Sequence, residues 1–121
     1  SESESYSTNK LNANALVEEN PTSESNSYYH LIKLFINNDS SFYLNFLKIH
    51  PDFGEKLLNI NPTLKSSDIE FCAYIKLNLD TKQIAQYKKI SVRAVEGKKY
   101  RIRKKLNIMP DDNMYIWISK L

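Results

Sequence analysis

The chain has 121 residues, which is enough for one small domain with a single hydrophobic core. Hydrophobic residues make up 41% of the chain, but no apolar run approaches the roughly 20 residues that cross a bilayer. The start of the chain also lacks the basic and apolar regions of a signal peptide. We therefore expect a cytoplasmic protein without membrane contact. Its single cysteine, Cys72, excludes an internal disulfide and zinc-finger cysteine spacing.

The formal net charge of +3 hides a strong asymmetry between the two halves of the chain. Residues 1–60 carry four Lys and eight Asp or Glu, a net charge of −4, whereas residues 61–121 carry 13 basic and six acidic residues, a net charge of +7. A basic half of this kind favours a polyanionic partner, so the C-terminal half is the candidate for nucleic-acid binding.

Residues 1–27 are rich in Ser, Glu and Asn and poor in large apolar side chains. Such a composition cannot bury enough surface to offset the entropy lost on ordering the chain. We interpret residues 1–27 as a disordered linker or an added tail, with at most one marginal helical turn between Leu11 and Glu19.

Residues 28–61 are predicted to form a short helical extension. The stretch YYHLIKLFINN has the length and apolar content of a helix, and Phe42, Phe46 and Ile49 in the next stretch recur at i, i+4 and i+7. Pro51 cannot continue that second helix but suits the start of a third one, PDFGEKLLNI. We expect the aromatic side chains of the extension to pack against the following domain.

Residues 62–121 are predicted to form the second unit, which begins after Asn61-Pro62-Thr63. Ser67 and Glu70 have the spacing of a capping box for its first helix. The buried side of that helix is expected to carry Ile69, Cys72, Ala73 and Ile75. No histidine or acid stands next to Cys72 in sequence to activate a thiolate, so we interpret it as a small core residue.

A short helix and a long basic helix follow in close succession. Asp80 and Gln83 form a second capping-type pair before TKQIAQYKK, whose Ile84 and Ala85 are expected to face inward. Ser91 caps the next helix, 92–106. The apolar stripe of that helix is predicted to consist of Val92, Val95, Ile102 and Leu106.

Residues 88–105 hold nine basic residues against one acid, Glu96, a local net charge of +8. Like charge at this density repels itself unless a polyanion neutralises it. A helix, a tight turn and a longer basic helix follow one another as in a helix-turn-helix motif. After a break at residues 109–112, a last helix is predicted with an exposed stripe of Met114, Trp117 and Leu121, and with Ile118 beside it.

Several spaced residues resemble the LuxR-type (GerE-like) helix-turn-helix domain of bacterial transcription regulators. The matching positions are Leu64, Asp68, Thr81-Lys82-Gln83-Ile84-Ala85, Ile90-Ser91, Val95 and Lys105-Leu106. The resemblance is greatest to regulators of Bacteroidetes bacteria, in which this domain ends a longer sensory chain. It implies an all-α fold: a LuxR-type four-helix domain at 62–121, preceded by the helical extension. It also implies sequence-specific binding of double-stranded DNA by a transcriptional regulator, with helix 92–106 in the major groove.

Three positions depart from the family pattern. Lys65 replaces the usual threonine cap, so the first helix of the domain is expected to start at Ser66 or Ser67. Lys88 replaces the usual leucine near the end of the second helix, and its aliphatic stem must cover the core unless Tyr87 does so. Gly97 lies inside the basic helix, either to permit close approach to DNA or through drift at an exposed site.

Matching the family motif position by position selects two groups of site residues. The base-contacting candidates are Arg93, Glu96, Gly97 and Tyr100. The phosphate-contacting candidates are Thr81, Lys82, Lys98, Arg101, Arg103 and Lys105. The last helix, with Met114, Trp117, Ile118 and Leu121, resembles the helix through which the family forms homodimers on DNA.

Two other functions stay open: a protein–protein interaction or signalling module with incidental DNA affinity, and a sigma-factor region-4-like helix-turn-helix. An enzyme is not expected, because the sequence lacks paired carboxylates in a motif, a glycine-rich phosphate loop and a nucleophile–histidine arrangement. His30 and His50 have no cysteine or acidic cluster at metal-ligand spacing. We therefore predict neither a metal site nor a cofactor.

Overall fold

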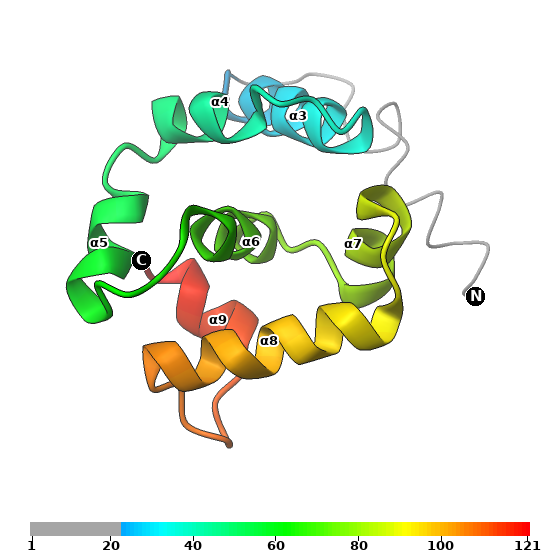
Figure 1. Ribbon diagram of the computed structural model, residues 1–121. Coiled ribbons are helices and arrows are strands. Elements are labelled where there is room, and N and C mark those ends of the chain that lie inside the picture. Colours follow the sequence, from blue (N-terminus) through cyan, green and yellow to red (C-terminus); the bar gives the residue numbers. More distant parts are fainter. Residues whose placement is uncertain (1–22) are drawn as a thin grey trace.

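The computed structural model describes residues 23–121, and every regular element in that range is an α-helix (Figure 1). The helices are α3 (Ser23–Ile36), α4 (Phe42–Ile49), α5 (Phe53–Ile60), α6 (Ser66–Lys76), α7 (Thr81–Lys88), α8 (Val92–Leu106) and α9 (Met114–Ser119). The predicted all-α class is confirmed. Most of the expected linker, residues 1–22, lies outside the described residues, but α3 already begins at Ser23 rather than at Tyr28.

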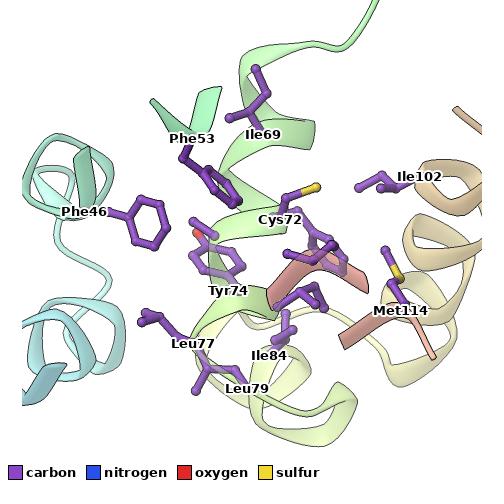
Figure 2. Packing of buried hydrophobic residues seen from close by; sticks show 14 of the residues in the cluster. Phe46, Phe53, Ile69, Cys72, Tyr74, Leu77, Leu79, Ile84, Ile102 and Met114 are labelled. Carbon is purple, nitrogen blue, oxygen red and sulfur yellow. The ribbon is translucent and has the colours of Figure 1, made fainter. Parts of the chain in front are cut away.

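Helix α6 is the centre of the fold, with α3 and α4 on one side of it and α8 on the other (Figure 1). Its four predicted core residues are buried, which confirms that prediction, and Phe71 and Tyr74 are buried as well. Side chains from α4, α5, α8 and α9 converge on α6 (Figure 2). The helical extension and the C-terminal helices therefore share one continuous core.

An aromatic series connects the extension to α6. The rings of Phe42 and Phe46 stack at 6.2 Å between centroids, and Phe46 meets Phe53 edge-on at 4.9 Å. Phe35 of α3 meets Tyr74 of α6 edge-on at 5.0 Å. Pairs in these geometries contribute about 0.5–1.5 kcal/mol each beyond the area they bury. Ile49, the third residue of the predicted stripe, lies at the margin of this packing and is 40% exposed.

Cys72 is fully buried and unpaired, as the sequence indicates. Burial, reinforced by the negative charge of Asp68, raises the pKa of its thiol to about 12. The thiol is therefore protonated and unreactive at neutral pH, which confirms that Cys72 is a core residue.

The start of α6 differs from the predicted capping box. The helix begins at Ser66 after Lys65, so its third residue is Asp68, and Asp68 Oδ2 accepts a hydrogen bond from the Lys65 backbone N at 2.9 Å. The predicted pairing of Ser67 with Glu70 is wrong because it places the cap two residues too late. Glu70 instead accepts a hydrogen bond from the Tyr74 hydroxyl at 2.7 Å.

Both Lys88 and Tyr87 cover the core at the end of α7, although from the sequence they are alternatives. Lys88 Nζ lies 5.3 Å from the centre of the Tyr74 ring and donates to Asn38 Oδ1 at 2.6 Å. The neighbouring Tyr87 ring meets Phe35 edge-on at 5.9 Å. The lysine thus covers the core with its stem while its ammonium group reaches the end of α3.

Candidate nucleic-acid interface

Helix α7 and helix α8 are joined by three residues, Lys89, Ile90 and Ser91. The predicted capping pair at the start of α7 is confirmed: Asp80 Oδ1 accepts from the Gln83 backbone N at 2.8 Å, and Gln83 Oε1 accepts from the Asp80 backbone N at 2.9 Å. Lys89 adopts a left-handed backbone conformation, with φ 58° and ψ 46°, which ends α7 and turns the chain. These contacts fix the direction in which α8 leaves the turn.

The start of α8 is capped as predicted, because Ser91 Oγ accepts a hydrogen bond from the Ala94 backbone N at 3.0 Å. Val95, Ile102 and Leu106 are buried, which confirms the predicted stripe from Val95 onward. Val92 is 41% exposed, so its assignment to the stripe is wrong. The helix packs on its neighbours only after its first turn, which leaves the N-terminal end accessible.

The four predicted base-contacting residues share one face of α8. Residues of a helix are separated by about 100°, which places Arg93, Glu96, Gly97 and Tyr100 roughly opposite Val95. Arg93, Glu96 and Tyr100 are exposed, and Gly97 is half-buried. We call this side, together with Arg101 and Lys104, the outer face of α8. The opposite side of the helix carries the buried Val95 and Ile102, so the outer face is turned away from the core, with Arg101 at its edge.

Gly97 leaves room on the outer face. A Cβ atom at this position would have the Arg101 guanidinium as its nearest neighbour, at 3.3 Å. That guanidinium is the end of a flexible, exposed side chain and can move aside. Nothing inside the domain therefore requires a glycine here, and it costs about 0.8–1 kcal/mol relative to alanine.

Asp68 engages two of the predicted phosphate-contacting residues. Lys98 Nζ and Lys105 Nζ lie 3.2 Å from Asp68 Oδ1 and Oδ2, respectively. The Asp68 side chain is only 9% exposed, whereas those of Lys98 and Lys105 are 25% and 34% exposed. Burial alone would raise the pKa of Asp68, but hydrogen bonds from the Lys65 backbone and from both lysines outweigh it and lower the pKa. The two lysines thus hold a buried carboxylate between α6 and α8.

Arg103 and Thr81 also have partners within the domain. Arg103 Nη2 donates to the carbonyl oxygens of Met109 and Asp112 at 2.7 and 3.0 Å and so holds the loop between α8 and α9. Thr81 Oγ1 accepts a hydrogen bond from Lys99 Nζ at 2.6 Å. Arg103 would have to release these carbonyl oxygens in order to reach DNA, whereas the Thr81 hydroxyl still has its own hydrogen to donate.

Lys99 links three helices. Besides its hydrogen bond to Thr81 of α7, its Nζ lies 4.7 Å from the centre of the Tyr115 ring of α9. Burial lowers the pKa of Lys99, and the nearby Asp80 and Glu96 carboxylates partly oppose that change. Lys99 is a structural lysine, although the sequence counts it among the cations of the basic run.

The exposed cations of α7, the turn and α8 are therefore fewer than the sequence suggests. Lys82 and Arg101 are exposed, as a phosphate contact requires, and so are Lys89 and Lys104, which were not among the predicted contacts. Lys104 Nζ lies 5.4 Å from the centre of the Tyr100 ring on the outer face. The signal that could have identified Lys104 is its helical phase, which puts it directly opposite Val95 and Ile102.

The last helix is anchored in the core. Asn113 caps it by accepting from the backbone N of Tyr115 at 2.8 Å. Met114 and Ile118 are 5% and 0% exposed, so the expectation that Met114 is exposed for dimerisation is wrong, and Ile118 is equally inaccessible. Both side chains fill the space between α6 and α8 that a short closing helix must occupy. Trp117 and Leu121 are half-buried against the same core.

Within residues 23–121 no three His, Cys, Asp or Glu side chains are grouped so as to hold a metal ion. The same part of the chain contains no helix that is long and apolar enough to span a membrane.

Comparisons of the chain with protein-family models, with curated proteins and with solved structures find no match. The basis for a functional assignment is therefore the set of residues and contacts described above.

Proposed function

We propose that residues 62–121 are a LuxR-type helix-turn-helix domain, the DNA-binding output domain of a bacterial transcriptional regulator. It binds double-stranded DNA sequence-specifically by placing α8 in the major groove. The observation that carries the proposal is the outer face of α8. Arg93, Tyr100, Arg101 and Lys104 are all exposed there, with Glu96 as the single acid, on a helix that follows a capped helix and a three-residue turn.

The outer face contains suitable groups for reading bases. An arginine such as Arg93 donates two hydrogen bonds to the O6 and N7 atoms of guanine, and a carboxylate such as Glu96 accepts from the N4 amino group of cytosine. Each correct contact of this kind contributes about 1–3 kcal/mol of discrimination against another base. Gly97 lies between these side chains and lets the helix backbone approach the base edges closely.

Phosphate contacts come from the exposed cations around that face. Lys82, Lys89, Arg101 and Lys104 are placed to neutralise phosphates, which fix the position of the helix without reading sequence. Because each neutralised phosphate contributes about −0.9 to the slope of log K against log salt, these four contacts predict a slope of about −3.6 for each bound chain. Lys98 and Lys105 mainly hold Asp68 and contribute less.

The first test is the anisotropy of a fluorescein-labelled duplex titrated with the full chain at several salt concentrations. The proposal predicts binding that weakens steeply with salt. Arg101→Ala should make the slope shallower by about 0.9, whereas Lys48→Ala, which removes an exposed charge from α4, should leave it unchanged. Undetectable binding at low salt, or an affinity that does not vary with salt, would contradict the proposal.

A second test separates base contacts from phosphate contacts. Glu96→Ala should relax the preference among sequences, because it removes a group that can read a base. Arg101→Ala should weaken binding to all sequences by a similar factor. If both variants change specific and random duplexes in the same proportion, the assignment of Glu96 as a reader is wrong.

A homodimer on DNA is part of the proposal, with Trp117 and Leu121 as the remaining contact residues of α9. Ile116, beside them in sequence, is 57% exposed and adds apolar surface. Analytical ultracentrifugation with and without a bound duplex measures the stoichiometry directly. Two chains on one duplex are expected, and a single chain on its specific site would overturn this part.

A further inference from the structure

A groove of about 460 Å³ lies between α6, α7 and the N-terminal half of α8. None of the four predicted base readers lines it; the α8 residues that do are Ala94 and Lys98, on the flank that faces α6, and Arg101 at the edge of the outer face. Phe71 and Ile84 form its floor, and Ile90 and Ala94 form an accessible wall. Ile90 is 46% exposed although it occupies the turn between two packed helices. Volumes of this order accommodate side chains of a bound ligand or helix.

Basic side chains also line this groove. Lys88, Lys98 and Arg101 line the groove, whereas Glu70 is the only acid that does. Glu70 accepts a hydrogen bond from the neutral Tyr74 hydroxyl at 2.7 Å and keeps its charge, so it offsets only part of the positive charge of the lining. Lys88 approaches from α7, and Lys98 and Arg101 approach from α8, so positive charge reaches the groove from two helices.

The three basic side chains differ in how far contacts within the domain already occupy them. Lys98 is paired with Asp68, and Lys88 donates to the neutral side chain of Asn38 at 2.6 Å. A hydrogen bond to a neutral amide leaves the charge of Lys88 uncompensated. Arg101 is exposed and has no hydrogen bond or ion pair to another described residue. Lys88 of α7 and Arg101 of α8 therefore both bring positive charge to the groove without an ion pair to another described residue.

We propose that this groove binds an amphipathic helix of a partner protein, one that has aliphatic side chains on one face and carboxylates along both edges of that face. Aliphatic side chains at i, i+3 and i+4 fill the strip formed by Ile90 and Ala94, as in other complexes in which a helix lies in a groove. The flanking carboxylates pair with Lys88 and Arg101, and like-charged basic helices are repelled. The proposal does not depend on DNA binding. Where DNA does bind, the partner competes with it for Arg101.

The probe is a synthetic peptide of about 15 residues, with leucines at i, i+3, i+4 and i+7 and glutamates at the flanking positions. Two matched control peptides are used. One has the same composition with leucine and glutamate no longer segregated on a helix, and the other has lysine in place of glutamate. Each is titrated into the full chain labelled with ¹⁵N, and the backbone amide shifts of the chain are recorded.

The proposal predicts saturable shifts centred on Ile90 and Ala94 for the acidic amphipathic peptide, with much weaker binding of both controls. Ile90→Asp and Arg101→Ala should each weaken the interaction by about fivefold or more, because they repel a carboxylate or remove its partner. Lys48→Ala should change it by less than about twofold, since Lys48 lies on α4. The circular dichroism of each variant shows that its fold is retained.

Three results would overturn the proposal: shifts that map elsewhere, equal binding of the segregated and the scrambled peptides, and shifts at Ile90 that appear with protein concentration alone. The last result would assign the groove to a second copy of this chain. None of these measurements involves DNA, so their failure is distinguishable from failure of the proposed function. In the presence of a labelled duplex, the acidic peptide should raise the apparent Kd for DNA, and the scrambled peptide should not.

Discussion

Replacing Asp68 with alanine tests how α8 is held against α6. The Asp68 carboxylate accepts a hydrogen bond from the Lys65 backbone at 2.9 Å and pairs with Lys98 and Lys105 at 3.2 Å each. Losing the helix-capping interaction costs about 1 kcal/mol. Each ion pair contributes about 0.5 kcal/mol, because both lysines are part-exposed and can be solvated once the acid is gone. We expect the free energy of unfolding to fall by about 2 kcal/mol.

The assay is urea unfolding followed by circular dichroism, with Asp52→Ala as the matched control. Asp52 is likewise an acid at the start of a helix, immediately before α5, but its side chain is exposed and makes no capping hydrogen bond. The control should change the free energy of unfolding by less than about 0.5 kcal/mol. Equal effects of the two substitutions would refute the reasoning, since it attributes the stabilisation to the three contacts of Asp68.

The wild-type chain and Asp68→Ala should also differ in how their stability depends on pH. The pKa of Asp68 in the folded chain lies below its ordinary value of 3.8, so the unfolded chain binds a proton more readily. The stabilisation is therefore fully present above about pH 5 and is lost as the pH falls through 3.8 toward the lowered pKa. The stability difference between the wild-type chain and Asp68→Ala should shrink over that range. A difference that stays constant down to pH 3 would contradict the ion pairs.

Three further predictions follow from particular side chains. Gly97→Ala should raise the free energy of unfolding by about 0.8–1 kcal/mol in thermal or urea unfolding. Gly54→Ala should raise it by less, because its Cβ would lie 2.8 Å from the Tyr43 hydroxyl, which must move; a gain at Gly54 as large as that at Gly97 would be inconsistent with the local geometry. Burial lowers the pKa of His50, aided by two nearby lysines, so stability should rise with pH through about 6.5, and His50→Gln should flatten that rise. Cys72 should react with a thiol reagent only at the rate of unfolding, and rapid modification of the native chain would show that it is not buried.

Much of the fold could be predicted from local patterns. The capping pair of Asp80 and Gln83 and the Ser91 cap identify the starts of α7 and α8 because these signals involve residues three positions apart. Four of the buried residues of α6 follow from apolar spacing, whereas Phe71 and Tyr74, which are buried as well, were not predicted. Apolar spacing predicts burial wrongly where a helix extends beyond its packed part. Val92 fits the apolar stripe of α8 by its spacing, but no helix covers it at that end.

The candidate site was harder to predict, because the sequence shows which residues are charged but not which groups they pair with in the folded chain. The basic run contains cations of two kinds, and sequence alone cannot distinguish them. Lys98 and Lys105 approach Asp68 from a helix about 30 residues later, and Arg103 folds back on its own loop. The family resemblance placed the predicted base readers on one face of α8. Met114 was misassigned because the role of α9 in closing the core depends on tertiary packing.

The central claim is that the outer face of α8 reads the sequence of duplex DNA. Its most direct test is selection of bound duplexes from a random pool by the full chain at physiological salt, with Glu96→Ala selected in parallel. The claim predicts that one consensus sequence is enriched by the wild-type chain and that Glu96→Ala loses the preference at one or two positions of it. A pool that stays random through successive rounds, or that yields the same consensus for both proteins, would contradict it.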